Sequence, residues 1–153
     1  MDLIFWRHAE AELEGVGDDD LARALTAKGE RQAKRMAEWL NHRLAHSTRI
    51  FVSPALRCQQ TAKALGRKFR TLPELAPGAA AKDLLRAARW PESAEPVLII
   101  GHQPVLGLAA SLVLTGVEQA WSIKKGAAWW LRHRPRDEES QVVLQAVQSP
   151  DCL

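Results

Sequence analysis

Residues 97–114 read VLIIGHQPVLGLAASLVL, and this stretch indicates the fold class. Its first four residues form an unbroken aliphatic run, which is typical of a strand buried on both faces. A Gly101-His102-Gln103-Pro104 turn follows, and a strongly apolar helix is predicted over 105–114. A buried strand that passes directly into a helix is the unit from which α/β proteins are built.

The same alternation recurs along the chain. We predict strands at 3–6, 50–52 and 69–72, helices at 26–44, 54–65 and 80–89, and two adjacent antiparallel strands at 129–131 and 142–144. Thr26 and Ser53 stand where the first two helices need an N-cap. The alternation predicts an α/β three-layer sandwich, with a mostly parallel central sheet flanked by helices and one domain over residues 1–153.

The composition fits a globular domain of ordinary size. The 153 residues are 46% hydrophobic and 25% charged, so the chain can bury a core. The net charge of +3 is spread out rather than gathered in a basic run, which argues against a nucleic-acid partner. The two cysteines, Cys58 and Cys152, suggest neither a disulfide framework nor a metal site. Since no signal peptide or membrane span is recognisable, we expect a cytoplasmic location and no membrane partner.

Polar side chains follow three of the predicted strands. Arg7 and His8 come directly after the first strand, Arg57 lies in the helix after the second, and His102 follows the strand at 97–100. In open α/β sheets the working residues gather beyond the carboxyl ends of the strands. We therefore expect two guanidinium groups and two imidazoles to converge on one anion site.

This residue set suits phosphoryl transfer. Bidentate arginine contacts match the geometry of phosphoryl oxygens, and charge stabilisation does most of the work in this reaction class. A neutral histidine can attack phosphorus, and water then hydrolyses the phosphohistidine intermediate. His8 must be neutral near pH 7 for this role, and nearby arginines favour the neutral form. The arginines already neutralise the phosphate, so no metal or other cofactor is expected.

Each of these residues also has an ordinary structural explanation. Arg7-His8 taken alone suits a surface pair, Arg57 a solvated helix residue, and His102 a capping residue in a turn. Their joint placement at strand-to-helix junctions of one α/β pattern favours the functional interpretation.

Four ordered motifs carry a resemblance to a known family: Arg7-His8-Ala9-Glu10-Ala11, Leu25-Thr26-Ala27-Lys28-Gly29, the stretch SPALRCQQTA at 53–62, and Ile100-Gly101-His102-Gln103-Pro104. The chain resembles the histidine phosphatase superfamily, and most of all its small SixA-type phosphohistidine phosphatase branch. The resemblance implies a phosphoglycerate mutase-like fold with no lid domain. It also implies that Arg7, His8, Arg57 and His102 form the catalytic core, with His8 as nucleophile, which are the four residues reached above.

The chain departs from the wider superfamily in places. Ala9 stands where the superfamily usually has glycine, which the small branch tolerates. The connection from 61 to 97 is too short for the insertions that cover the site and supply an acid in larger members, so we expect an open site. Glu74 stands roughly where that acid would be, and a loop acid that fixes a turn is an equally good interpretation. Arg23 either contacts substrate phosphate or pairs with the acidic loop at 18–20.

The expected function is that of a metal-independent phosphohydrolase in signal transduction. It would form a phosphohistidine enzyme intermediate and dephosphorylate phosphohistidine on a protein. Its partner would be a phosphorylated protein, a phosphohistidine carrier, or a small phosphorylated substrate. The alternatives are a phosphomonoesterase for a small metabolite or nucleotide, with Glu74 as general acid, and a non-catalytic phosphoprotein-binding module.

Overall fold

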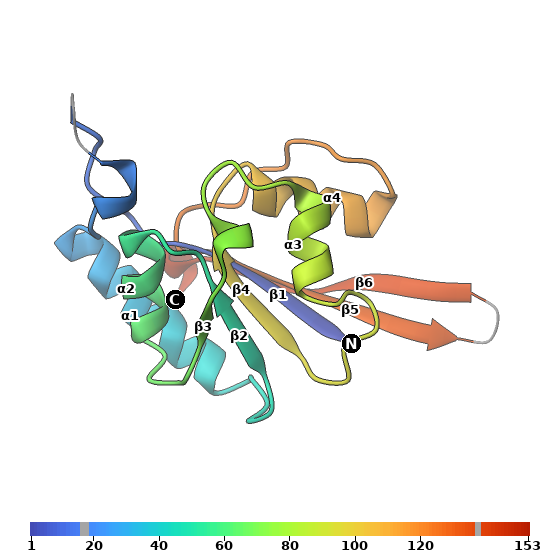
Figure 1. Cartoon of the computed structure of the whole chain (residues 1–153). Coiled ribbons are helices and arrows are strands. Elements are labelled where there is room, and N and C mark those ends of the chain that lie inside the picture. Colours follow the sequence, from blue (N-terminus) through green and yellow to red (C-terminus); the bar gives the residue numbers. More distant parts are fainter. Residues whose placement is uncertain (16–18, 137–138) are drawn as a thin grey trace.

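A six-stranded sheet forms the centre of the computed structural model, which describes residues 1–15, 19–136 and 139–153 (Figure 1). The strands are β1 (Asp2–Arg7), β2 (Arg49–Val52), β3 (Arg70–Thr71), β4 (Val97–Gly101), β5 (Ala128–Arg136) and β6 (Glu139–Gln148). They lie in the order β3-β2-β4-β1-β5-β6. The first four pair in parallel, whereas β5 pairs antiparallel with both β1 and β6. The prediction of a mostly parallel sheet is confirmed.

Helices cover both faces of this sheet. Helices α1 (Ala27–Asn41) and α2 (Leu56–Lys63) lie on one face, and α3 (Ala81–Ala87) and α4 (Val105–Thr115) lie on the other (Figure 1). Three short 3-10 helices, η1 (Asp20–Ala22), η2 (Pro73–Leu75) and η3 (Pro150–Cys152), complete the elements. The predicted α/β three-layer sandwich is therefore confirmed, and no lid domain is seen within the described ranges. No helix in the described part of the chain combines the length and apolar character needed to cross a membrane.

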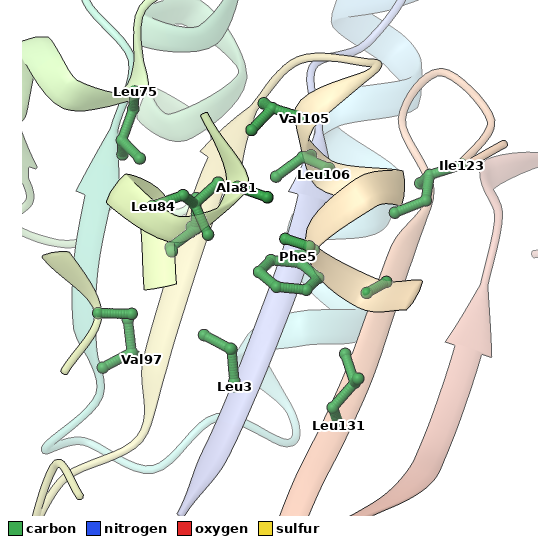
Figure 2. Close-up of a cluster of buried hydrophobic side chains, with 14 of the residues drawn as sticks. Leu3, Phe5, Leu75, Ala81, Leu84, Val97, Val105, Leu106, Ile123 and Leu131 are labelled. Carbon is green, nitrogen blue, oxygen red and sulfur yellow. The ribbon is translucent and has the colours of Figure 1, made fainter. Parts of the chain in front are cut away.

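The apolar run in β1 is explained by burial on both faces. Leu3 and Phe5 pack in the cluster under α3 and α4, which Figure 2 shows together with Leu106 of α4. Ile4 and Trp6 belong to the cluster under α1 and α2. All four strand residues have 0% exposed surface, so neither face of β1 meets water. Because successive side chains of a strand point to opposite faces, a strand between two helical layers must be apolar throughout.

The start of α1 is fixed by two local features. The Thr26 hydroxyl accepts a hydrogen bond from the Gly29 amide at 2.9 Å, so the predicted N-cap is confirmed. A Cβ atom on Gly29 would lie 1.9 Å from the carbonyl oxygen of Glu10, which excludes any side chain there. The helix therefore packs directly against the chain that follows His8. The helix ends at Asn41, earlier than the predicted end at residue 44.

Three predictions on secondary structure need correction. Ser53 is not the N-cap of α2: Ala55 is, without a side-chain hydrogen bond. The strand predicted at 69–72 is reduced to the two residues of β3. Strands β5 and β6 have 9 and 10 residues, far longer than predicted from their apolar centres. Their backbone ladder continues through polar positions such as Arg132 and His133, where the apolar pattern gives no signal.

Candidate active site

The register between β1 and β4 places the two histidines side by side. Arg7 pairs with Gly101 across the parallel ladder, so His8 and His102 leave neighbouring strands at the same level. The amide of His8 donates to the carbonyl oxygen of Gly101 at 3.1 Å. The two imidazole rings have centroids 5.4 Å apart. The structure thus brings together two residues that lie far apart in sequence.

The ring of His8 is held by its own backbone neighbour. Its Nδ1 atom lies 2.8 Å from the carbonyl oxygen of Ala9. A carbonyl oxygen only accepts hydrogen bonds, so Nδ1 must carry the hydrogen, and in the neutral ring Nε2 then holds the lone pair. Ala9 is itself fully buried, and its amide donates to Thr61 Oγ1 at 3.1 Å. The neighbour that orients His8 is therefore anchored to α2.

Both histidines are uncharged at neutral pH. Burial, together with the charges of His102, Arg57 and Arg7, lowers the pKa of His8 to about 3, against the opposing effect of the hydrogen bond to the Ala9 carbonyl. Burial likewise lowers the pKa of His102 to about 4, with Arg57 as the next contribution. A nucleophilic imidazole must be neutral, and the surroundings of His8 meet this condition.

Arg7 is fixed along one side of its guanidinium group. Its Nη1 donates to the carbonyl oxygen of Ile123 at 2.8 Å. That carbonyl lies in the segment between α4 and β5, which approaches α4 so closely that a Cβ on Gly107 would lie 1.7 Å from the oxygen of Trp121. The Nε of Arg7 is buried and finds no hydrogen-bond partner among the described residues.

Arg57 is the second residue of α2 and is only 3% exposed. Its Nη1 donates to the backbone oxygen of Asp20 at 2.7 Å, and its Nη2 lies 3.1 Å from Asp20 Oδ2. The same Nη2 lies 3.4 Å from Nδ1 of His102. As with Arg7, the buried Nε has no partner within the described residues. Each arginine therefore keeps one N–H donor without a partner among the described residues.

His102 is oriented by Ser53, which the sequence pattern predicts to be a helix N-cap. Its Nε2 lies 2.7 Å from Ser53 Oγ, which also accepts from the amide of Ala55 at 3.2 Å. Arg57 can only donate to Nδ1, so the hydrogen of the neutral His102 ring is on Nε2 and points to Ser53. The Ser53 hydroxyl therefore holds the His102 ring and is not the N-cap of α2. Cys58 Sγ lies 3.5 Å from the same Nε2, and burial raises the pKa of its thiol to about 12, so this sulfur stays protonated.

A cavity of about 290 Å³ joins these groups. It is lined by Arg7, His8, Ala11, Leu13, Arg23, Arg57, Pro77, His102, Gln103 and Lys125. All five residues predicted for the site therefore border one space. The lining also includes Gln103 and Lys125, which sequence analysis did not select. Gln103 lies inside a quoted motif, whereas Lys125 lies in the final third of the sequence, where no motif was recognised.

Arg23 lies at the cavity and also pairs with the acidic loop, so both positions expected for it are observed. It borders the cavity, and its Nε and Nη2 each lie 3.0 Å from Asp20 Oδ1. Its Nη1 donates to the carbonyl oxygen of Glu12 at 2.8 Å. Asp20 is the described member of the acidic loop that pairs with Arg23, while Asp18 lies outside the described residues.

Glu74 is not part of this cavity. It borders a different cavity of about 530 Å³, together with Phe51 of β2 and Asp83 of α3. Although that cavity is larger, it is lined by neither histidine and by neither Arg7 nor Arg57. The larger cavity is therefore not the candidate active site, because an active site is identified by the chemical groups that line it and not by its volume.

The arrangement can hold a tetrahedral oxyanion beside an imidazole lone pair. Guanidinium N–H groups supply charge-assisted hydrogen bonds, and the low local dielectric strengthens them. Among the described residues, no group of three or more His, Cys, Asp or Glu side chains is placed to hold a metal ion.

Comparison with known proteins identifies the family. The model of the histidine phosphatase superfamily (branch 1) matches residues 3–80, which include Arg7, His8, Arg23 and Arg57. The chain belongs to the histidine phosphatase superfamily. This histidine phosphatase is 30% identical over 124 residues to the phosphohistidine phosphatase SixA of Escherichia coli strain K12, a match that covers 76% of each chain.

A solved structure supports placement in the small SixA-type branch. A structure of the protein histidine phosphatase SixA complexed with tungstate matches with a TM-score of 0.81 and 27% identity, and covers 99% of each chain. A phosphoserine phosphatase mutant from Entamoeba histolytica, in complex with phosphoserine, matches with a TM-score of 0.72 and covers 99% of this histidine phosphatase and 98% of that chain. At 15% identity this second match shows a shared fold only.

Proposed function

We propose that this phosphatase removes phosphoryl groups from phosphohistidine on a protein, by way of a phosphohistidine intermediate on His8. One observation carries the proposal: a neutral imidazole with its lone pair on Nε2 borders the same cavity as Arg7 and Arg57, whose Nε donors are unused. In this proposal the two arginines bind phosphoryl oxygens. His102 lies at the phosphoryl site on the neighbouring strand, where its Nδ1 accepts from Arg57, and Arg23 adds positive charge at the rim.

The first step transfers the phosphoryl group to His8. The Nε2 lone pair attacks phosphorus, and the P–N bond of the substrate breaks. Its electron pair stays on the substrate imidazole, which takes up a proton from solvent. The His8 ring keeps its Nδ1 hydrogen throughout, and the positive charge that develops on the ring is stabilised by the Ala9 carbonyl at 2.8 Å.

The second step frees the enzyme. Water attacks the phosphorus of phospho-His8, the P–Nε2 bond breaks, and its electron pair returns to Nε2. The attacking water loses a proton to solvent, and inorganic phosphate leaves. The low pKa of His8 favours this release, because the buried ring is more stable neutral than charged.

A phosphohistidine substrate suits the residues around the cavity. None of its described lining residues is an aspartate or glutamate, so no carboxylic acid is placed there to protonate an alcohol leaving group. An imidazole leaves more readily than an alkoxide, and it depends less on such an acid. The rim residue Leu13 is 89% exposed, which leaves room for a protein surface at the cavity. The arginines supply the positive charge, so the proposed reaction requires no metal.

The proposal is tested by phosphate release from a phosphohistidine-bearing carrier protein without added metal. Wild type, His8→Ala and His46→Ala are compared, since His46 is an exposed histidine away from the cavity. Phosphoserine is supplied in parallel as an ester substrate. We expect rapid release from the carrier by wild type and His46→Ala, and only the uncatalysed rate with His8→Ala.

Two results would support the alternatives instead. Rapid hydrolysis of phosphoserine with an untouched carrier would indicate a phosphomonoesterase for small molecules. Binding of the carrier with no release from either substrate would indicate a phosphoprotein-binding module.

A further inference from the structure

The carboxylate of Asp20 lies between two arginines of the candidate site. Its Oδ2 is 3.1 Å from Arg57 Nη2, and its Oδ1 is 3.0 Å from both Nε and Nη2 of Arg23. Its backbone oxygen accepts a further hydrogen bond from Arg57 Nη1 at 2.7 Å. One residue of η1 thus accepts from two side chains that come from α2 and from the segment after η1.

Asp20 occupies one edge of the Arg57 guanidinium group and leaves another free. The occupied edge carries Nη1 and Nη2, whereas Nε is buried and unused. Arg7 is held in a similar way. Its Nη1 donates to the carbonyl oxygen of Ile123, and its Nε has no partner among the described residues. A guanidinium group is planar and rigid, so contacts along one edge fix the orientation of the whole group. Asp20 itself is absent from the described lining of the cavity.

The contact also acts on His102. Arg57 Nη2 lies between Asp20 Oδ2 and Nδ1 of His102, at 3.1 and 3.4 Å. The position of the carboxylate therefore determines where Arg57 meets the second histidine. The hydrogen bonds from Arg57 and Arg23 lower the pKa of Asp20 in spite of the opposing effect of burial, so Asp20 is charged at neutral pH.

We infer that Asp20 is a positioning residue for the phosphoryl site, which holds Arg57 in place beside His102 at the cavity and brings Arg23 to the rim. The inference rests on the proposed function only in that this cavity binds a phosphoryl anion. Asp20 holds the two arginines without contacting the substrate. The binding of a tetrahedral oxyanion therefore depends on a carboxylate outside the cavity.

A competing role for Asp20 predicts the opposite behaviour. If its carboxylate filled the place of the phosphoryl group, its removal would free Arg57 and tighten anion binding. If it orients Arg57, its removal loosens a buried guanidinium group and weakens anion binding. The sign of the change in affinity separates the two roles.

The experiment titrates the whole protein with inorganic phosphate by calorimetry, so it needs no substrate assignment. The variants are Asp20→Ala and Asp20→Asn, with Asp19→Ala and Asp83→Ala as controls. Asp19 caps η1 through the Leu21 amide at 3.0 Å, and Asp83 makes an exposed ion pair with Arg86 at 3.0 Å. We expect Asp20→Ala to weaken phosphate binding about tenfold or more, as for the loss of hydrogen bonds between charged groups, and Asp20→Asn to fall in between. Both controls should bind like wild type.

A second readout separates positioning from a general loss of structure. In the double variant Asp20→Ala/Arg23→Ala, the loss of affinity should be smaller than the sum of the two single losses, because the residues act together. Unchanged or tighter binding by Asp20→Ala would overturn the inference, and so would an equal loss in Asp83→Ala. If wild type binds phosphate but leaves the phosphohistidine carrier intact, the proposed substrate fails while this inference stands.

Discussion

Nδ1 of His8 lies 2.8 Å from the carbonyl oxygen of Ala9, and this contact selects the nitrogen that carries the lone pair. The acceptor belongs to the next residue in the chain, so the orientation does not rely on a distant side chain. The residue after the histidine is buried and anchored through Thr61. The tautomer of the proposed nucleophile is therefore a property of the strand end itself.

The low pKa values of the two histidines predict a pH-dependent stability. In the unfolded chain both titrate near 6.5, whereas in the folded protein His8 titrates at about 3 and His102 at about 4. The unfolded state therefore binds more protons between those values, and the free energy of unfolding falls as the pH drops from 6.5 toward 4. Urea unfolding of wild type and His8→Ala between pH 5 and 6.5 tests this. The variant should take up about one proton fewer on unfolding at pH 5. Equal slopes would contradict a depressed pKa for His8.

Ser53→Ala should impair His102 without removing it. The variant leaves the Nε2 hydrogen of His102 without its acceptor at 2.7 Å. We expect a loss of about 1–3 kcal/mol in the free energy of unfolding. A decrease of about tenfold in turnover should follow if about 1.4 kcal/mol of transition-state stabilisation is lost. Ser93→Ala is the matched control, since Ser93 is also buried and donates to the Glu95 carbonyl away from the site. An equal effect of both variants on turnover would rule out a specific role for Ser53.

Gly29→Ala should destabilise the protein through a steric clash. The added Cβ would lie 1.9 Å from the carbonyl oxygen of Glu10, so the helix and the chain after His8 must move apart. We expect a cost of about 1–3 kcal/mol in thermal or urea unfolding. Lys28→Ala, one position earlier on the exposed side of α1, should leave stability unchanged. A Gly29→Ala variant as stable as wild type would show that the close approach is unimportant.

Glu74→Gln should leave the hydrolysis of phosphate esters unchanged. Its side chain borders a cavity that contains neither histidine, so it is not placed to protonate a leaving group. The rate with phosphoserine, measured across pH for wild type and variant, checks this. A strong and pH-dependent slowing in the variant would instead establish Glu74 as the general acid.

Much of the fold and the composition of the site could be predicted from the sequence, because the signals that define them lie within single helices and strands. Apolar runs and helical spacing are read within one element, and a parallel sheet brings the ends of its strands to a common edge. His8 and His102 follow such strands directly, which is why their proximity could be expected. The lengths of β5 and β6 were predicted too short. Backbone hydrogen bonds between the two strands continue through polar residues, which give no apolar signal in the sequence.

The polar partners of the site residues were harder to predict. Asp20 lies 37 residues before Arg57, on a segment without a helical or strand pattern, so nothing in the spacing pairs them. Ser53 precedes a proline and has the sequence features of a helix cap, yet its hydroxyl also lies within reach of His102, 49 residues away. Such contacts depend on how loops pack, which local periodicity does not encode.

The central claim is that His8 carries the phosphoryl group. We would mix the protein with a phosphohistidine-bearing carrier, quench rapidly, and measure intact mass and phosphorylation site by mass spectrometry. We predict a phosphoryl adduct on His8 in wild type and none at any position in His8→Ala. An adduct on another residue, or turnover by His8→Ala at the wild-type rate, would contradict the account.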